Sequence, residues 1–195
     1  MALVILAVVI LLGAVAVSYC ATIFNGLVAL KNNIQKAWAN IDVLLKQRHD
    51  ELPKLIKTCE GYMNHEKAVF DRVLKAREAL MRAPGPGPKG LAEGELHGAI
   101  RQLFALAENY PDLKAQGSFQ QLQSRITALE SEIADRREFY NDSVNVYNIR
   151  IASLPDMFFA RMMALAPQEM FQVSEADKQD VNIEFNSGAR LKPGT

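Results

Sequence analysis

The three histidines are the side chains best suited to bind a metal ion, and their spacing argues against a metal site. His65 precedes Glu66, as in the zinc-protease motif His-Glu-x-x-His, but Val69 stands where the second histidine would be. His49 and His97 belong to other segments, whereas zinc needs several ligands that converge on one point. We therefore expect no metal ion and no cofactor.

Serine and carboxylate side chains form no catalytic pattern. Ser118, Ser143 and Ser153 have no neighbouring histidine and stand in no Gly-x-Ser-x-Gly motif. Acidic residues alternate with arginines along one segment, as on the solvated face of a helix. The acidic residues are Glu130, Glu132, Asp135 and Glu138, and the arginines are Arg125, Arg136 and Arg137. We expect no catalytic residues and no enzymatic activity.

Two pairs of asparagines share a seven-residue spacing. Asn33 and Asn40 form one pair and Asn141 and Asn148 the other, so that each pair occupies one face of a helix. Asparagine at a seam between helices can determine their register at a cost in stability, and we favour this structural role. The alternative is a groove for a ligand or a partner, lined by these amides. Its aromatic walls would be Trp38, Tyr140 and Tyr147.

The first thirty residues carry no charged side chain, and Leu3–Phe24 consists mostly of Leu, Ile, Val and Ala. About 20 such residues, at roughly 1.5 Å each in a helix, cross a hydrocarbon core of about 30 Å. A signal peptide would have basic residues before the run and small residues at a cleavage site, and neither is clear here. A lipoprotein signal would place a small residue before Cys20, where Tyr19 stands. We predict an uncleaved anchor that contacts the lipid bilayer through residues 3–24, with cleavage or lipidation as alternatives.

The orientation of the anchor follows from the basic residues around it. Lys31 and Lys36 are the nearest, and none precedes the apolar run. Because an excess of basic residues marks the cytoplasmic flank, we expect a single-pass protein with its N-terminus outside and its body in the cytoplasm.

The charges balance, with 22 Lys and Arg against 22 Asp and Glu, all of them beyond residue 30. A nucleic-acid-binding domain is expected to have a basic excess, so nucleic acid is not an expected partner. Cys20 and Cys59 are too few for a disulfide framework or a metal cluster. The part of the chain after the anchor is long enough for one domain with a core, but too short to argue for two.

Apolar residues between residues 34 and 80 recur at helical intervals of three, four and seven. They are Ile34, Trp38, Ile41, Leu45, Leu52, Ile56, Cys59, Met63, Phe70, Val73 and Leu80. Pro53 falls inside this stripe, where it removes one backbone donor and clashes with the preceding turn. We predict that the helix kinks or reverses near residues 50–52.

Proline and glycine alternate between Ala83 and Gly90, which predicts a surface connection that is neither helix nor strand. A third helix is expected over residues 91–110. Ser118 is the expected N-cap of a fourth, which ends before Pro155. These stripes predict an all-α fold, in which an N-terminal transmembrane helix precedes an antiparallel four-helix bundle.

The predicted regions are an anchor (1–30), the bundle (31–166), and a polar, partly disordered tail (167–195). In the tail, Val181, Ile183 and Phe185 alternate as in a brief extended segment.

An apolar stretch follows Pro155 and is expected to form a short C-terminal helix. It contains Met157, Phe158, Phe159, Met162 and Met163. An up-down-up-down bundle would return this stretch to the membrane side. It is too short to span, so it either lies at the membrane interface or plugs the end of the bundle core.

Several motifs, in order along nearly the whole chain, resemble the LemA family. The motifs are Phe24–Val28, Ala37–Val43, Arg48–Asp50 with Pro53, Ala107–Ala115, Arg136–Asp142, Tyr147-Asn148 and Leu154-Pro155. The motif residues that are candidates for interaction are Trp38, Asn40, Asp42, Arg48, Pro53, Tyr110, Pro111, Asp112, Arg137, Tyr140, Asn141, Tyr147, Asn148 and Pro155. The chain departs from the family in its Pro-Gly run, in Phe24 where tyrosine is usual, and in its Met-rich segment.

The resemblance implies a membrane-anchored four-helix bundle with its short N-terminus outside, which in a bacterium places it in the inner membrane. It implies no particular reaction, although relatives associated with magnetosome membranes suggest a role in membrane organisation. We hypothesise a non-enzymatic scaffold or interaction module of the cell envelope, with protein partners or self-association. The alternative is a ligand receptor or an enzyme with a site between helices. Self-association through the anchor would use its small residues Gly13, Ala14 and Ala16.

Overall fold

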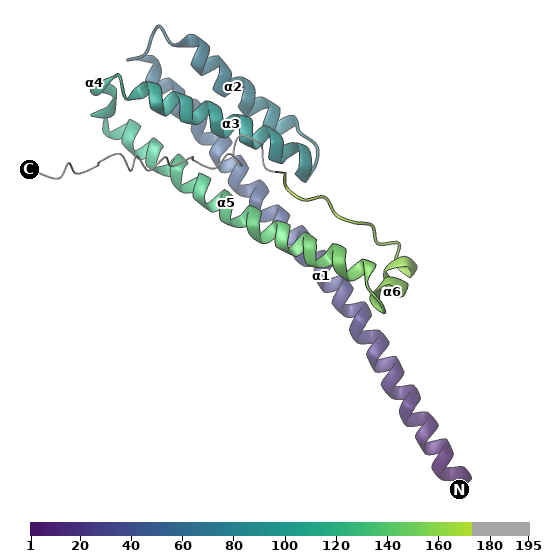
Figure 1. The fold of residues 1–195 in the computed structure, drawn as a ribbon. Coiled ribbons are helices and arrows are strands. Elements are labelled where there is room, and N and C mark those ends of the chain that lie inside the picture. The colour runs from purple at the N-terminus through teal and green to yellow at the C-terminus, as the bar shows by residue number, and fades with distance from the viewer. Residues whose placement is uncertain (173–195) are drawn as a thin grey trace, which may run out of the picture.

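The structure is a computed structural model that describes residues 1–172, and helices form most of this part (Figure 1). The four long helices are α1 (Ala2–Glu60), α2 (Lys67–Arg82), α3 (Pro86–Ala107) and α5 (Gly117–Ala152). The two short ones are α4 (Pro111–Lys114) and α6 (Asp156–Met162). The predicted all-α fold, with a long apolar N-terminal helix and a helical bundle, is confirmed. The extended segment predicted at Val181, Ile183 and Phe185 lies outside the described residues.

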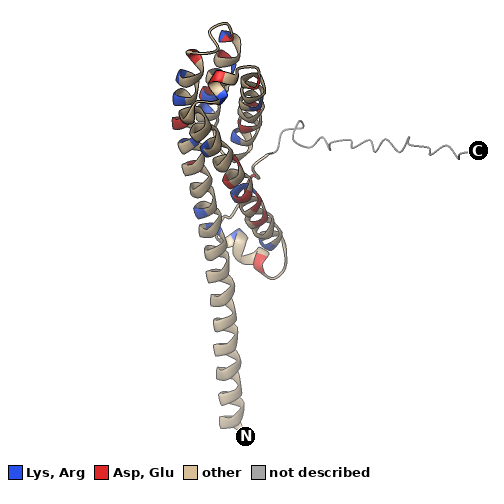
Figure 2. Cartoon of the chain, turned by 90° about the vertical axis from the view of Figure 1, so that its left-hand side faces the viewer, with Lys and Arg blue, Asp and Glu red and all other residues tan. Residues whose placement is uncertain are grey.

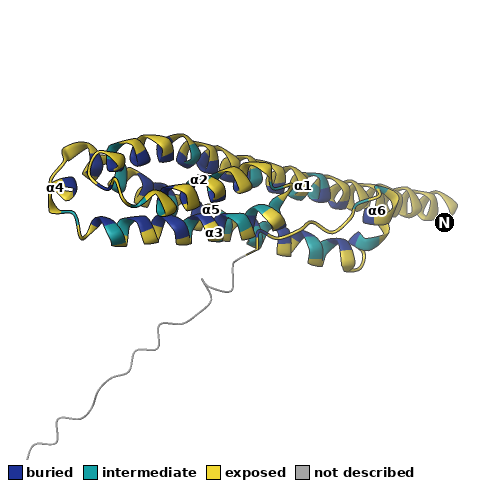
Figure 3. Ribbon diagram, turned by 90° about the horizontal axis from the view of Figure 1, so that it is seen from above, coloured by how far each residue is buried: buried dark blue, intermediate teal, exposed yellow. Residues whose placement is uncertain are grey.

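Helix α1 is both the apolar N-terminal segment and the first helix of the bundle. Its 59 residues extend over about 90 Å at roughly 1.5 Å per residue. Residues 1–22 are exposed, and buried positions begin at Ile23 and recur as far as Cys59 (Figure 3). Figure 2 shows no charged residue in the N-terminal half of α1, and this half is long and apolar enough to cross a membrane.

Helix α1 continues through Pro53, so a reversal at residues 50–52 is wrong. Pro53 is exposed, while Leu52 and Leu55 beside it are buried in the core. Burying a leucine side chain contributes about 1.5–3 kcal/mol to stability. Because the apolar stripe keeps its phase across the proline, burial of these leucines offsets the loss of one backbone hydrogen bond. The chain reverses between α1 and α2, at residues 61–66.

Helix α3 begins inside the Pro-Gly run, so the prediction of a wholly non-helical connection there is wrong. Pro86 and Pro88 stand in the first turn of the helix, where backbone N–H groups have no partner within the helix and the φ of proline suits the conformation. Gly85, just before the helix, has a φ of +72°, a conformation that favours glycine. The helix therefore starts at residue 86 instead of residue 91 and ends at residue 107 instead of residue 110.

Helix α5 begins at Gly117, two residues earlier than a Ser118 cap would place it. Gln116 occupies the cap position and no side chain makes a capping hydrogen bond, so the prediction that Ser118 is the N-cap is wrong. The helix ends at Ala152, and a short turn through Pro155 leads into α6.

The long helices pack as two antiparallel pairs. Helix α5 lies along α1, and the hairpin of α2 and α3 covers the end of this pair that is far from the N-terminus (Figure 1). Helix α6 returns to α1, as the up-down-up-down topology predicts. A Cβ atom at Gly26 of α1 would lie 3.0 Å from Arg150 Nη2 near the end of α5, so the protein contacts begin where the apolar span ends.

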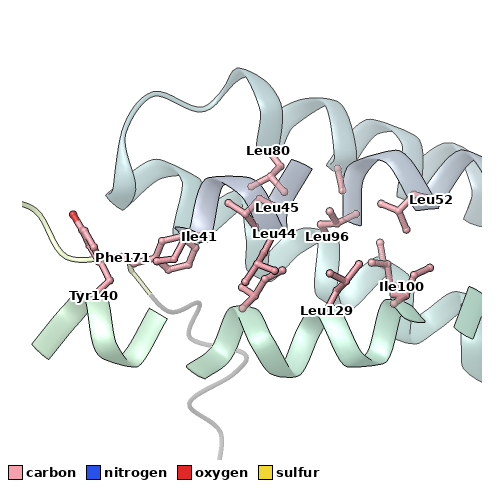
Figure 4. Close-up of a cluster of buried hydrophobic side chains, with 14 of the residues drawn as sticks. Ile41, Leu44, Leu45, Leu52, Leu80, Leu96, Ile100, Leu129, Tyr140 and Phe171 are labelled. Atoms are coloured by element: carbon pink, nitrogen blue, oxygen red, sulfur yellow. The ribbon is translucent and has the colours of Figure 1, made fainter. Parts of the chain in front are cut away.

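Leucine and isoleucine side chains from all four long helices fill the core (Figure 4). The residues shown there include Leu45 and Leu52 from α1, Leu80 from α2, Leu96 and Ile100 from α3, and Leu129 from α5. Of these, Leu45, Leu52 and Leu80 lie on the apolar stripe that the sequence predicts between residues 34 and 80.

Candidate functional site

An extended segment, residues 166–172, leaves α6 and runs back along α5 in the antiparallel direction (Figure 1). We call this segment the strap. It falls in the region predicted to start the polar tail, yet Phe171 within it is only 1% exposed. The bundle therefore holds a piece of chain that is neither helix nor strand.

Asn141 and Asn148 of α5 each bind one residue of the strap through its main chain. The Nδ2 atom of Asn141 donates to the carbonyl oxygen of Phe171 at 3.0 Å, and its Oδ1 atom accepts from the Phe171 N–H at 2.8 Å. Asn148 pairs in the same way with Gln168, with both distances at 2.9 Å. The amides thus satisfy the backbone groups that a neighbouring β-strand would otherwise satisfy.

The tyrosine before each asparagine adds a third contact. Tyr140 donates its hydroxyl proton to the carbonyl of Glu169 at 2.8 Å, and Tyr147 donates to the carbonyl of Ala166 at 3.3 Å. Burial, together with the charge of Glu169, raises the pKa of Tyr140 to about 12, and burial also raises the pKa of Tyr147. Both phenols therefore remain donors at neutral pH.

The spacing of these contacts follows from helix and strand geometry. Two Tyr-Asn pairs seven residues apart on a helix are separated by about 10.5 Å. Three residues of extended chain span about 10 Å. The two asparagines bind strap residues that are three apart, and so do the two tyrosines. We call Tyr140, Asn141, Tyr147 and Asn148 the Tyr-Asn face of α5.

Phe171 provides the apolar anchor of the strap. Its ring lies 6.2 Å from that of Trp38, which lies 5.6 Å from the ring of Tyr140, measured between centroids (Figure 4 shows Tyr140 and Phe171). The ammonium group of Lys89 sits 5.4 Å above the Trp38 ring and pairs with Asp42. Aromatic contacts at these distances are worth about 0.5–1.5 kcal/mol beyond the area they bury.

Two glycines of α3 form the opposite wall of the groove. A Cβ atom at Gly90 would lie 2.2 Å from the carbonyl oxygen of Gln172, far inside van der Waals contact, and one at Gly87 would lie 3.3 Å from Glu169 Oε2. The Pro-Gly run that was expected to form only a loop therefore lets the strap approach the backbone of α3 closely.

Asn141 and Asn148 line one groove, and their amides bind a segment of the same chain. A ligand or partner in this groove stays a prediction. Trp38, Tyr140 and Tyr147 join them as expected, but the chain itself fills the groove. Asn33 and Asn40 are exposed on α1. The signal for the groove was the repeated Tyr-Asn pair, and no sequence signal identified Phe171 as its occupant.

A second polar cluster is buried inside the bundle around Arg48, which is 0% exposed. Its Nη1 atom donates to Glu93 Oε1 at 3.1 Å and lies 3.8 Å from Glu130. Arg137 approaches Glu93 at 3.9 Å, and His97 approaches Glu130 at 3.3 Å. The cluster borders a cavity of about 170 Å³ between α3 and α5. Glu93, which the sequence did not mark, is the main partner of Arg48.

The remaining motif residues lie apart from the groove and serve local structure. Tyr110 donates to Glu66 at 3.1 Å, which ties the start of α4 to the start of α2. Pro111 is the first residue of α4, and Asp112 lies exposed in its first turn. Pro155 precedes the first residue of α6.

The apolar stretch of α6 divides into two faces. Phe158 and Met162 are 63% and 71% exposed, and Leu154 just before the helix is 68% exposed. Phe159 and Met163 pack against the core instead, and Met157 is partly buried. Phe159 and Met163 therefore fit the interpretation that this stretch plugs the end of the core, and contact with lipid stays a prediction for the exposed face.

Comparison with known proteins gives one family over most of the chain. The model of the LemA family matches residues 37–185. The chain is 28% identical to Protein LemA of Metamycoplasma hominis over 162 residues, which cover 81% of this chain and 73% of the relative. It is 23% identical to Magnetosome protein MamQ 2 of Paramagnetospirillum magneticum over 189 residues, covering 82% and 70%.

Replacing Arg48 tests the buried cluster. Arg48→Ala leaves Glu93 buried without its main partner, so we expect a loss of about 3–5 kcal/mol in the free energy of unfolding. Arg125→Ala is the matched control, because Arg125 pairs with Glu51 from a largely exposed position, where a pair is worth about 0–1 kcal/mol. Urea unfolding followed by circular dichroism measures both, and equal losses would contradict the role of Arg48.

Proposed function

Because the chain belongs to the LemA family, we propose that it is a non-enzymatic scaffold that holds a helical bundle at the membrane and binds other proteins of the cell envelope. The observation that carries the proposal is the continuity of α1, which runs from the apolar span into the bundle core as one helix. A rigid connection gives the bundle a defined orientation on the bilayer. A relative named as a magnetosome protein fits a role in membrane organisation.

The use of the polar side chains supports a non-enzymatic role. The side chains of the Tyr-Asn face form hydrogen bonds with the main chain of the strap. The acidic residues around Arg48 are engaged in ion pairs. Both sets of groups are engaged in contacts within the bundle. Catalysis would instead call for a nucleophile or base aimed at a space that a substrate can enter.

Photo-crosslinking in the membrane tests for partners. Val146 is 52% exposed beside an apolar hollow of about 320 Å³ between α1 and α5, whereas Glu132 lies exposed on α5 among charged residues. With a photoreactive residue at Val146 we expect adducts that contain a second envelope protein, and fewer from Glu132. Recovery of this chain alone from both positions, under several growth conditions, would refute the proposal.

The positive flank at Lys31 and Lys36 supports a cytoplasmic bundle. In a Pro84→Cys variant we expect an impermeant thiol reagent to label the new cysteine only after lysis, because Pro84 is exposed on the bundle. Native Cys59 gives little background, since it is fully buried and burial raises the pKa of its thiol to about 11. Cys20 is replaced by alanine.

The control for orientation is a cysteine at Ala2, at the opposite end of the span, which should be labelled in intact cells. Labelling of residue 84 in intact cells together with protection of residue 2 would reverse the proposed topology.

The exposed face of α6 supports contact with the lipid headgroups. Phe158 and Met162 point away from the core next to the end of the apolar span, where an amphipathic helix can lie in the interface. In vesicles with brominated lipids we expect stronger fluorescence quenching for Phe158→Trp than for Glu132→Trp, with Trp38 a constant background. Equal quenching would exclude the contact.

Stability distinguishes the two faces of α6 independently. Phe159→Ser should lose about 3 kcal/mol or more, because Phe159 packs on the core. Phe158→Ser should change the free energy of unfolding by no more than about 0.5 kcal/mol. Thermal melting followed by circular dichroism compares them.

A further inference from the structure

The groove recognises the strap almost entirely through its main chain. All six hydrogen bonds from the Tyr-Asn face end on backbone atoms of residues 166, 168, 169 and 171. Phe171 alone adds a buried side chain, while Met170 next to it is 41% exposed. Such a site accepts any extended segment that has an aromatic residue in this register, as in strand addition to a sheet edge.

The connection between α6 and the strap is short and strained. Residues 163–165 turn the chain back onto the bundle, and Ala164 has a φ of +50°. An L-residue other than glycine adopts this conformation only at an energetic cost. Opening the connection would relieve that cost at the expense of the contacts that Met163 and Leu165 make with the core. Short strained hinges favour exchange of the segment they hold.

The anchor makes a second copy of the chain the best-placed occupant. Copies inserted with the same orientation carry the groove and the strap at the same height above the bilayer, because α1 is continuous. Confinement to one membrane raises the effective concentration of each strap near the groove of its neighbour. The strap of a second copy also matches the groove in register and in its aromatic residue.

We propose that the Tyr-Asn face and the pocket around Trp38 form a binding site for the strap of a second copy, and that two chains exchange straps reciprocally in the membrane. The exchange closes a twofold pair, since each copy contributes one strap and one groove. It does not depend on the proposed binding of other envelope proteins, which is tested at Val146 outside the groove.

Complementation between two full-length variants tests the exchange. Asn141→Ala with Asn148→Ala damages the groove but leaves the strap intact, and Phe171→Ser damages the strap but leaves the groove intact. The two variants are co-expressed with different affinity tags, solubilised in mild detergent and captured through one tag. The mixed pair retains one intact groove and one intact strap, whereas each self-pair lacks either several hydrogen bonds or the anchor ring. The mixed pair should therefore be recovered at least about tenfold more than either variant paired with itself. The wild-type chain should pair with itself as well.

Matched controls lie beside each changed residue. Asn145→Ala is exposed on α5 between the two asparagines, and Met170→Ser is exposed on the strap, so both should pair like the wild type. Gly90→Ala should abolish pairing because a Cβ there collides with Gln172, whereas Gly98→Ala, with nothing within 4 Å of its Cβ, should not. Circular dichroism confirms that each variant keeps its helices.

Three results would overturn the proposal. Equal recovery of the mixed pair and the self-pairs would place any association elsewhere, such as in the anchor. A wild-type chain that stays monomeric, or a mixed pair that does not form while both variants remain folded, would show that the strap serves its own bundle or that another protein fills the groove.

Discussion

The structure depends on one apolar stripe that keeps its phase along α1 from Ile23 to Cys59. Helix α5 lies antiparallel along this stripe, and the α2–α3 hairpin covers its far half. The direction of α5 then returns α6 to the end of the apolar span, and the strap follows from α6. Because the stripe starts where the exposed anchor ends, the orientation of the span determines the orientation of everything packed on it.

Apolar burial is not directional, so the stripe alone does not specify how the helices match along their length. The cluster around Arg48 supplies that specificity, because Glu93 of α3 and Glu130 of α5 must both reach one guanidinium of α1. Burying charges costs free energy that close pairing only partly recovers. The cluster is thus better understood as selecting one register of three helices than as adding to their stability.

Helical periodicity allowed the helical fold and the stripe of core positions to be predicted, since buried residues must recur along one face. It did not identify the turn at residues 61–66 that separates α1 from α2. The predictions of a reversal at Pro53 and of a non-helical Pro-Gly run were wrong for a physical reason. A proline inside a helix costs about 3 kcal/mol, but Pro53 faces solvent while the residues around it continue the buried stripe, and Pro86 and Pro88 stand in a first turn that needs no donors. Asn141 and Asn148 were recognisable by spacing. Phe171 was not, because it meets Asn141 across 30 residues of sequence and has no periodic neighbours.

Seven residues of helix and three of extended chain differ in length by only about half an ångström, which explains how α5 can hold an extended segment. Each Tyr-Asn pair contacts two strap residues that are two apart, the tyrosine binding the earlier one and the asparagine the later one. The same order in both pairs suits one direction of the bound segment. One repeat further toward the start of α5, the corresponding residues are Ile133, which is buried in the core, and Ala134, which has no amide. One repeat further toward its end stand Leu154 and Pro155, beyond the helix. The sequence of α5 therefore provides two Tyr-Asn repeats, and these two repeats hold the stretch of strap from Ala166 to Phe171.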